Sequence, residues 1–188
     1  MAELTALESK IGEVLGLAMA AQGATRQVGK LVAKEGEHDD LKQALEQMHE
    51  EAKEAEKRTT SLAEDLDGKK TAILEKARET KQEATEMMST YLGDDADALD
   101  GFEFLTMAEA GEVGHWTVVR TMNERANLPG LQELVDWQIP IQQRHLEQTL
   151  KGSVELAADE DPNEPLSVCS RWRCWMGICQ STDRKSVV

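Results

Sequence analysis

The segment GEVGHW, residues 111–116, places Glu112 and His115 three residues apart in a stretch of helix-forming composition. Residues three or four apart share one face of a helix, so the acid and the imidazole are expected on the same side. Carboxylate oxygens and imidazole nitrogens are ligands that Fe(II), Mn(II) and Zn(II) accept. The same two groups could instead form a buried hydrogen-bonded network. The sequence leaves both interpretations open.

A similar spacing occurs after the connection NLPG, where Gln142 and His145 are three residues apart. A short connection joins antiparallel helices, so residues whose numbers sum to about 257 should lie at one level of the pair. This places Glu112 beside His145 and His115 beside Gln142. The segment MHEE, residues 48–51, lies in another helical stretch earlier in the chain. Its acids Glu50 and Glu51 are expected near the same level of the bundle.

Helical bundles that hold two metal ions take one Glu from each of two helices and Glu-x-x-His from each of the other two. This chain has neutral Gln142 at one such position and Gln22 at another, so the predicted site is degenerate and suits a single ion. The cofactor predicted is iron, with manganese or zinc as alternatives. The predicted metal ligands are Glu50, Glu51, Glu112, His115, Gln142 and His145.

The elements that position these residues are long amphipathic helices. Apolar residues recur at alternating steps of three and four, the spacing of helices packed in a bundle. We expect helices over 2–34, 39–66, 69–91, 102–127 and 129–158, kinked at Pro140. Trp116 and Trp137 are expected at the bundle edge. The predicted fold is all-α: two antiparallel hairpins forming a four-helix bundle, with an extra helix that links them.

Composition excludes some partners. The net charge is −15, which disfavours nucleic acid and anionic membranes, because binding phosphates requires clustered Lys and Arg. No apolar run approaches the roughly 20 residues of a membrane span, and the start lacks a signal-peptide pattern. We therefore expect a cytoplasmic protein whose small partner is a metal ion.

The last residues differ from the rest of the chain. All 3 cysteines lie beyond residue 165, in a spacing that suits no common zinc site, and the chain ends in DRKSVV. We predict a helical domain over 1–160, followed over 161–188 by an acidic linker and a disordered or artefactual tail. A redox-active tail is the alternative.

The blocks DDLKQALEQMHEEAKEAEKR and AEAGEVGHWTVVRTMNERANLPGLQELVDWQIPIQQRHLEQTL resemble the bacterial YciE/YciF-type ferritin-like proteins. The resemblance implies a rubrerythrin-like bundle, often a homodimer, associated with stress responses. It points to Glu50 or Glu51, Glu112, His115 and His145 as ligands. The predicted function is therefore metal binding in iron or oxidative-stress handling. The alternative is a non-catalytic helical scaffold or adaptor whose polar core is structural.

Overall fold

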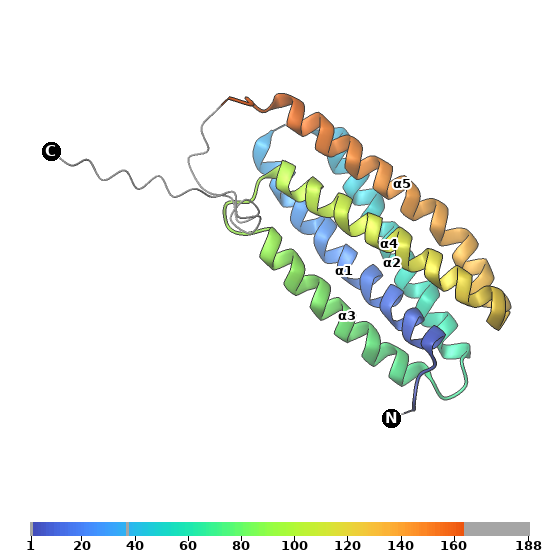
Figure 1. Ribbon diagram of the computed structural model, residues 1–188. Helices are drawn as coiled ribbons and strands as arrows, with labels where there is room; N and C mark the ends of the chain where they lie inside the picture. The colour runs from blue at the N-terminus through green and yellow to red at the C-terminus, as the bar shows by residue number, and fades with distance from the viewer. Residues whose placement is uncertain (1, 37, 164–188) are drawn as a thin grey trace.

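The computed structural model describes residues 2–36 and 38–163, and within them every regular element is an α-helix. The prediction of an all-α fold is confirmed. Four helices form a bundle with roughly aligned axes, and the fifth lies on its outside (Figure 1). The helices are α1 (Ala6–Glu35), α2 (Asp39–Asp65), α3 (Lys70–Tyr91), α4 (Ala98–Ala126) and α5 (Pro129–Asp159).

The outer helix α3 connects the two halves of the bundle. Helices α1 and α2 form one hairpin and α4 and α5 form the other, while α3 packs mainly along α1 (Figure 1). The chain runs up α1, down α2 and up α3, so that α4 begins at the same end as α2. The bundle therefore has one long crossover connection, which is made by α3. Helix α3 corresponds to the linking helix predicted over 69–91.

Local sequence explains where the helices begin. Thr5 caps α1 through a reciprocal pair of bonds: its hydroxyl accepts from the backbone N–H of Glu8, whose carboxylate accepts from the N–H of Thr5. Asp97 and Asp100 cap α4 in the same way, so α4 begins at Ala98 and not at residue 102 as predicted. Asn127, with φ 54°, ends α4 in the left-handed conformation.

The core consists of two apolar clusters separated along the bundle axis. The first cluster is Ile11, Val14, Leu15, Ala63, Ile73, Ala77, Trp116, Val119, Leu131, Leu134, Val135 and Ile139. The second cluster is Ala24, Val28, Val32, Leu41, Leu45, Leu92, Ala98, Phe102, Phe104, Leu105 and Leu156. Burial of these side chains supplies the main stabilising free energy of the fold. The candidate site lies between them.

Helices α1 and α3 approach especially closely at Gly16. A Cβ atom added at Gly16 would lie 2.4 Å from the carbonyl oxygen of Ala77, so only glycine permits this contact. Two turns further along α1, a Cβ added at Gly23 would meet nothing within 4 Å. A space therefore lies beside Gly23, next to the level of the candidate site.

Two further expectations concern the ends and surroundings of the chain. No helix in the described ranges is both long enough and apolar enough to cross a membrane. Helix α5 continues through Pro140 and ends at Asp159, close to the predicted domain boundary at 160. The predictions for the tail beyond residue 163 lie outside the described residues.

Candidate functional site: a buried carboxylate–histidine cluster

One face of α4 brings two acids into the core. Glu109 is 2% exposed and Glu112 is 5% exposed, between buried Leu105 and buried Trp116. The prediction placed His115 on this face, whereas the structure places the next residue, Trp116, there. A helix has 3.6 residues per turn, so inward-facing residues recur at steps of either three or four. Two neighbouring sets of residues on α4 fit this spacing, and the prediction chose the wrong one. Trp116 is therefore a core residue and not an edge residue.

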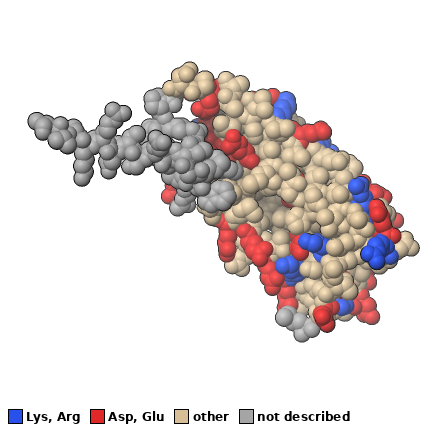
Figure 2. All heavy atoms as spheres, viewed as in Figure 1, with Lys and Arg blue, Asp and Glu red and all other residues tan. Residues whose placement is uncertain are grey.

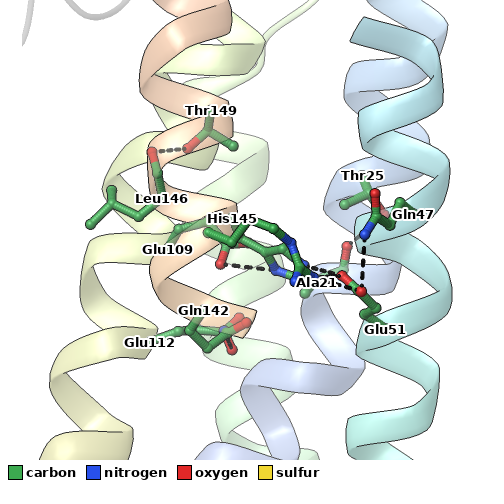
Figure 3. A network of polar contacts seen from close by, with 11 residues as sticks. Ala21, Thr25, Gln47, Glu51, Glu109, Glu112, Gln142, His145, Leu146 and Thr149 are labelled. Carbon is green, nitrogen blue, oxygen red and sulfur yellow. Dashed lines mark hydrogen bonds and ion pairs between the residues drawn. The ribbon is translucent and has the colours of Figure 1, made fainter. Parts of the chain in front are cut away.

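His145 of α5 lies at the centre of the cluster, with a carboxylate facing each ring nitrogen (Figure 3). Its Nε2 is 2.6 Å from Oε2 of Glu51 on α2. Its Nδ1 is 3.5 Å from Oε2 of Glu109 on α4, an ion-pair distance longer than a hydrogen bond. With both nitrogens facing acids and the ring 3% exposed, the arrangement suits an imidazolium that bridges α2 and α4.

The charge of Glu51 is offset on two sides. Arg144 donates to Oε1 and Oε2 of Glu51 at 2.6 Å each, in addition to the contact with His145. Burial alone would raise the pKa of Glu51, but hydrogen bonds from His145, Gln47 and Arg144 hold it below its ordinary value. Burial lowers the pKa of His145, but Glu109 and Glu51 outweigh burial and raise it. The contact between Glu51 and His145 therefore favours the ionised carboxylate and the protonated imidazole over their neutral forms.

Glu112 is in the opposite electrostatic situation. Its carboxyl is fully enclosed, and burial followed by the charge of Glu109 raises its pKa well above the ordinary value. The side-chain amide of Gln142 donates to Glu112 Oε2, and the two side chains point at each other in Figure 3. A neutral acid beside a neutral amide avoids placing a second negative charge next to Glu109.

The structure brings together four of the six predicted ligands and separates two. Glu51, Glu112, Gln142 and His145 converge, but the α4–α5 pairing is shifted by three residues from the prediction: Gln142 contacts Glu112 and His145 faces Glu109. His115 does not: its side chain is 38% exposed, and Nδ1 lies 3.4 Å from Glu13 of α1. Glu50 is exposed and pairs with Lys53 at 2.9 Å. The expectation that His115 and Glu50 face the cluster is therefore wrong.

The acid that the sequence prediction missed is Glu109. Its signal was present, because Glu109 and Glu112 repeat the same three-residue spacing as Glu112 and His115. Helix α1 contributes only Ala18, Ala21 and Thr25 to the small cavity at this level, and Gln22 instead donates to Glu56 at 2.5 Å. The acids of the cluster therefore come from α2 and α4, and α1 supplies none.

The donor set can be compared with what a metal ion needs. Three carboxyl groups, one imidazole and one amide are chemically suited to Fe(II), Mn(II) or Zn(II). Within residues 2–36 and 38–163, however, no three His, Cys, Asp or Glu side chains stand in an arrangement that could hold an ion. Glu51 and His145 are in direct contact, so an ion would replace the proton between them and the side chains would reorient.

Comparison with known proteins adds no assignment to this geometry. No protein-family model, no curated protein and no solved structure matches the chain.

Proposed function

We propose that the protein binds one divalent transition-metal ion, with iron as the first candidate, in a ferritin-like bundle that acts in iron or oxidative-stress handling. The single observation that carries the proposal is the pair of buried acids on α4. Glu109 Oε2 makes no hydrogen bond within the described part of the chain. Two enclosed carboxyl groups on one helix face repel each other when both are ionised, and a divalent cation relieves that repulsion.

The ligands proposed are Glu109, Glu112 and His145, with Glu51 as a fourth group. Gln142 is a neutral amide and would contribute orientation more than charge. A bound ion of this kind would supply Lewis acidity or, if it is iron, electron transfer. The topology and the resemblance of the two sequence blocks to ferritin-like proteins support the association with iron.

Metal binding at this site should release protons. Burial raises the pKa of Glu112, and Glu109 and Glu51 raise that of His145, so both groups bind protons more tightly than free side chains do. A metal ion binds the deprotonated forms of both groups. Affinity should therefore increase as the pH rises.

The test is calorimetric titration of the chelator-treated full chain with Fe(II) under anaerobic conditions, and with Mn(II) and Zn(II). We expect about one ion per chain. The double variant Glu109→Gln with Glu112→Gln should lose most of the affinity. The matched control is Glu50→Gln with His115→Ala, which removes predicted ligands that lie outside the cluster and should leave binding unchanged.

The comparison between variants matters more than total metal content, because ions bound loosely to the acidic surface add to the total but not to the difference between variants. Equal binding by the wild type and the Glu109/Glu112 variant would refute the site. Loss of binding in the Glu50/His115 control would instead restore the ligand set predicted from the sequence.

A second function, that of a non-catalytic scaffold, is favoured by a different observation. Arg144 and His145 together offset the charge of Glu51 without any metal ion. Networks of this kind fix the register of packed helices. A folded, helical chain that takes up none of the three metals would support this function over the first.

A further inference from the structure

A pocket of about 420 Å³ opens between α1, α3 and α4, beside the cluster. Its volume lies in the range of small-molecule sites. Its walls are mainly aliphatic and rich in methionine, and they include Leu17, Met19, Ala84, Met88, Leu105 and Met107. Figure 2 shows the face that carries α3 and α4, where acidic side chains gather over α3 and the surface between the two helices is largely uncharged.

The inner wall of this pocket differs from the rest. Glu109 and Glu112 line it, and both are at least nine-tenths buried. Glu109 Oε2 has no hydrogen-bond donor among the described residues, and its contact with His145 is 3.5 Å long. Glu109 Oε2 faces His145, so it is the rest of the Glu109 side chain, together with Glu112, that the pocket meets. The pocket thus combines an apolar body with an inner wall that carries two buried acids.

We propose that this pocket binds a small aliphatic amine, with its hydrocarbon chain along α1 and α3 and its ammonium group at Glu109 and Glu112. The proposal goes beyond metal binding and does not depend on it. The cationic head would offset the charge of Glu109, and the chain would cover apolar wall. An alcohol lacks the charge, and a carboxylate head would be repelled by Glu109 and by the net charge of −15.

Two other side chains with ionisable groups line the pocket, Lys81 of α3 and His115 of α4. Nδ1 of His115 lies 3.4 Å from Glu13 of α1, so the imidazole has a partner outside the pocket. Lys81 is exposed and offers the alternative arrangement, in which an anionic head stays at the rim. The buried acids favour the amine because an ion pair gains more inside the protein than at a solvated rim.

The glycines of the pocket allow it to be closed without disturbing packing. A Cβ atom at Gly111 meets nothing within 4 Å, and Gly111 lines the pocket. Gly114, on the same helix, is equally unobstructed and equally exposed but lies outside the pocket. Gly111→Leu is therefore a blocking variant and Gly114→Leu is its matched control.

The experiment uses the full chain in chelator, labelled at its methionine methyl carbons, and follows NMR shifts on titration with octylamine, 1-octanol, octanoate and 1,8-octanediamine. Octylamine should bind at least tenfold more tightly than octanol, and should shift Met19 and Met107 but not Met122. The diamine carries more charge yet should bind more weakly, because its second ammonium would enter the apolar region. Weaker binding of the diamine than of octylamine therefore distinguishes binding in the pocket from non-specific attraction of cations to the acidic surface.

The variants decide where and why the amine binds. Gly111→Leu should abolish binding while Gly114→Leu retains it. Glu109→Gln with Glu112→Gln should remove the preference for the amine over the alcohol. Tighter binding of octanoate would overturn the proposal in favour of a rim site at Lys81, and so would unchanged binding in folded Gly111→Leu. Because no metal is present, either result leaves the metal-binding test separate.

Discussion

The two apolar clusters and the polar layer between them solve the problem of burial in different ways. The cluster around Trp116 packs apolar side chains, and its one indole N–H, that of Trp116, has no hydrogen-bond partner among the described residues. In the polar layer almost every group has a specific one: His145 faces Glu51 and Glu109, and Gln142 faces Glu112. Apolar contacts are tolerant of exchange, whereas a buried polar group is expensive once its partner is removed. The clusters stabilise the bundle, and the polar layer fixes which residues meet.

The largest expected effect is in the apolar region. Trp116 is 1% exposed and fills the first cluster. Trp116→Ala should lower the free energy of unfolding by about 3–5 kcal/mol through lost burial and the cavity left behind. Urea unfolding measures it, with exposed Val118→Ala as a control that should stay within about 0.5 kcal/mol. A loss below about 1 kcal/mol for Trp116→Ala would mean that this cluster does not dominate stability.

In the polar layer, the change in free energy of unfolding should depend on whether a substitution leaves a buried polar group without its partner. Gln142→Leu alone leaves Glu112 without its amide and should cost about 1–3 kcal/mol. Adding Glu112→Leu removes the other partner, and the double variant should return to near the wild-type free energy of unfolding. A double-mutant cycle in urea gives the coupling. If the losses in free energy of unfolding of the two single variants simply add, Gln142 and Glu112 stabilise the fold independently of each other. The contrast between partner-dependent polar groups and tolerant apolar clusters would then be wrong.

The smallest effect concerns an acid at the end of the bundle. Half-burial, and then the charge of Asp97, raises the pKa of Asp100 to about 6. A carboxyl that binds its proton more tightly in the folded state stabilises it at low pH, and this contribution is lost as the pH rises from about 4 to about 6. Asp100→Asn keeps the capping geometry without the charge.

At pH 7.5 this substitution should therefore raise stability, by about 1 kcal/mol after allowance for solvent screening, and at pH 4 it should have little effect. Thermal unfolding at the two pH values measures the difference. Equal effects at both would show that Asp100 acts through its hydrogen bonds and not through its charge.

Several features of the fold could be predicted from single residues and their spacing. Helix composition and the short NLPG connection predicted the α4–α5 hairpin. The predicted partners across it, Glu112 for His145 and His115 for Gln142, were three residues out of register, because the structure pairs Glu109 with His145 and Glu112 with Gln142. The start of α4 was predicted four residues late, because the reciprocal bonds of Asp97 and Asp100 extend the helix into an acidic stretch that resembles a loop. Glu109 was missed because its three-residue spacing from Glu112 competes with the equal spacing of Glu112 and His115, and spacing alone does not decide which of the two outer residues faces inward.

The sequence by itself determined the helical class, the two hairpins and the supply of acids, imidazole and amide at one level, because periodicity and turn chemistry act locally. Only the tertiary structure decided that Glu109 and Trp116 face inward and His115 outward, because rotation of a helix by part of a turn depends on all its neighbours. It also decided the pocket, since α3 touches α1 at Gly16 and leaves open space at Gly23.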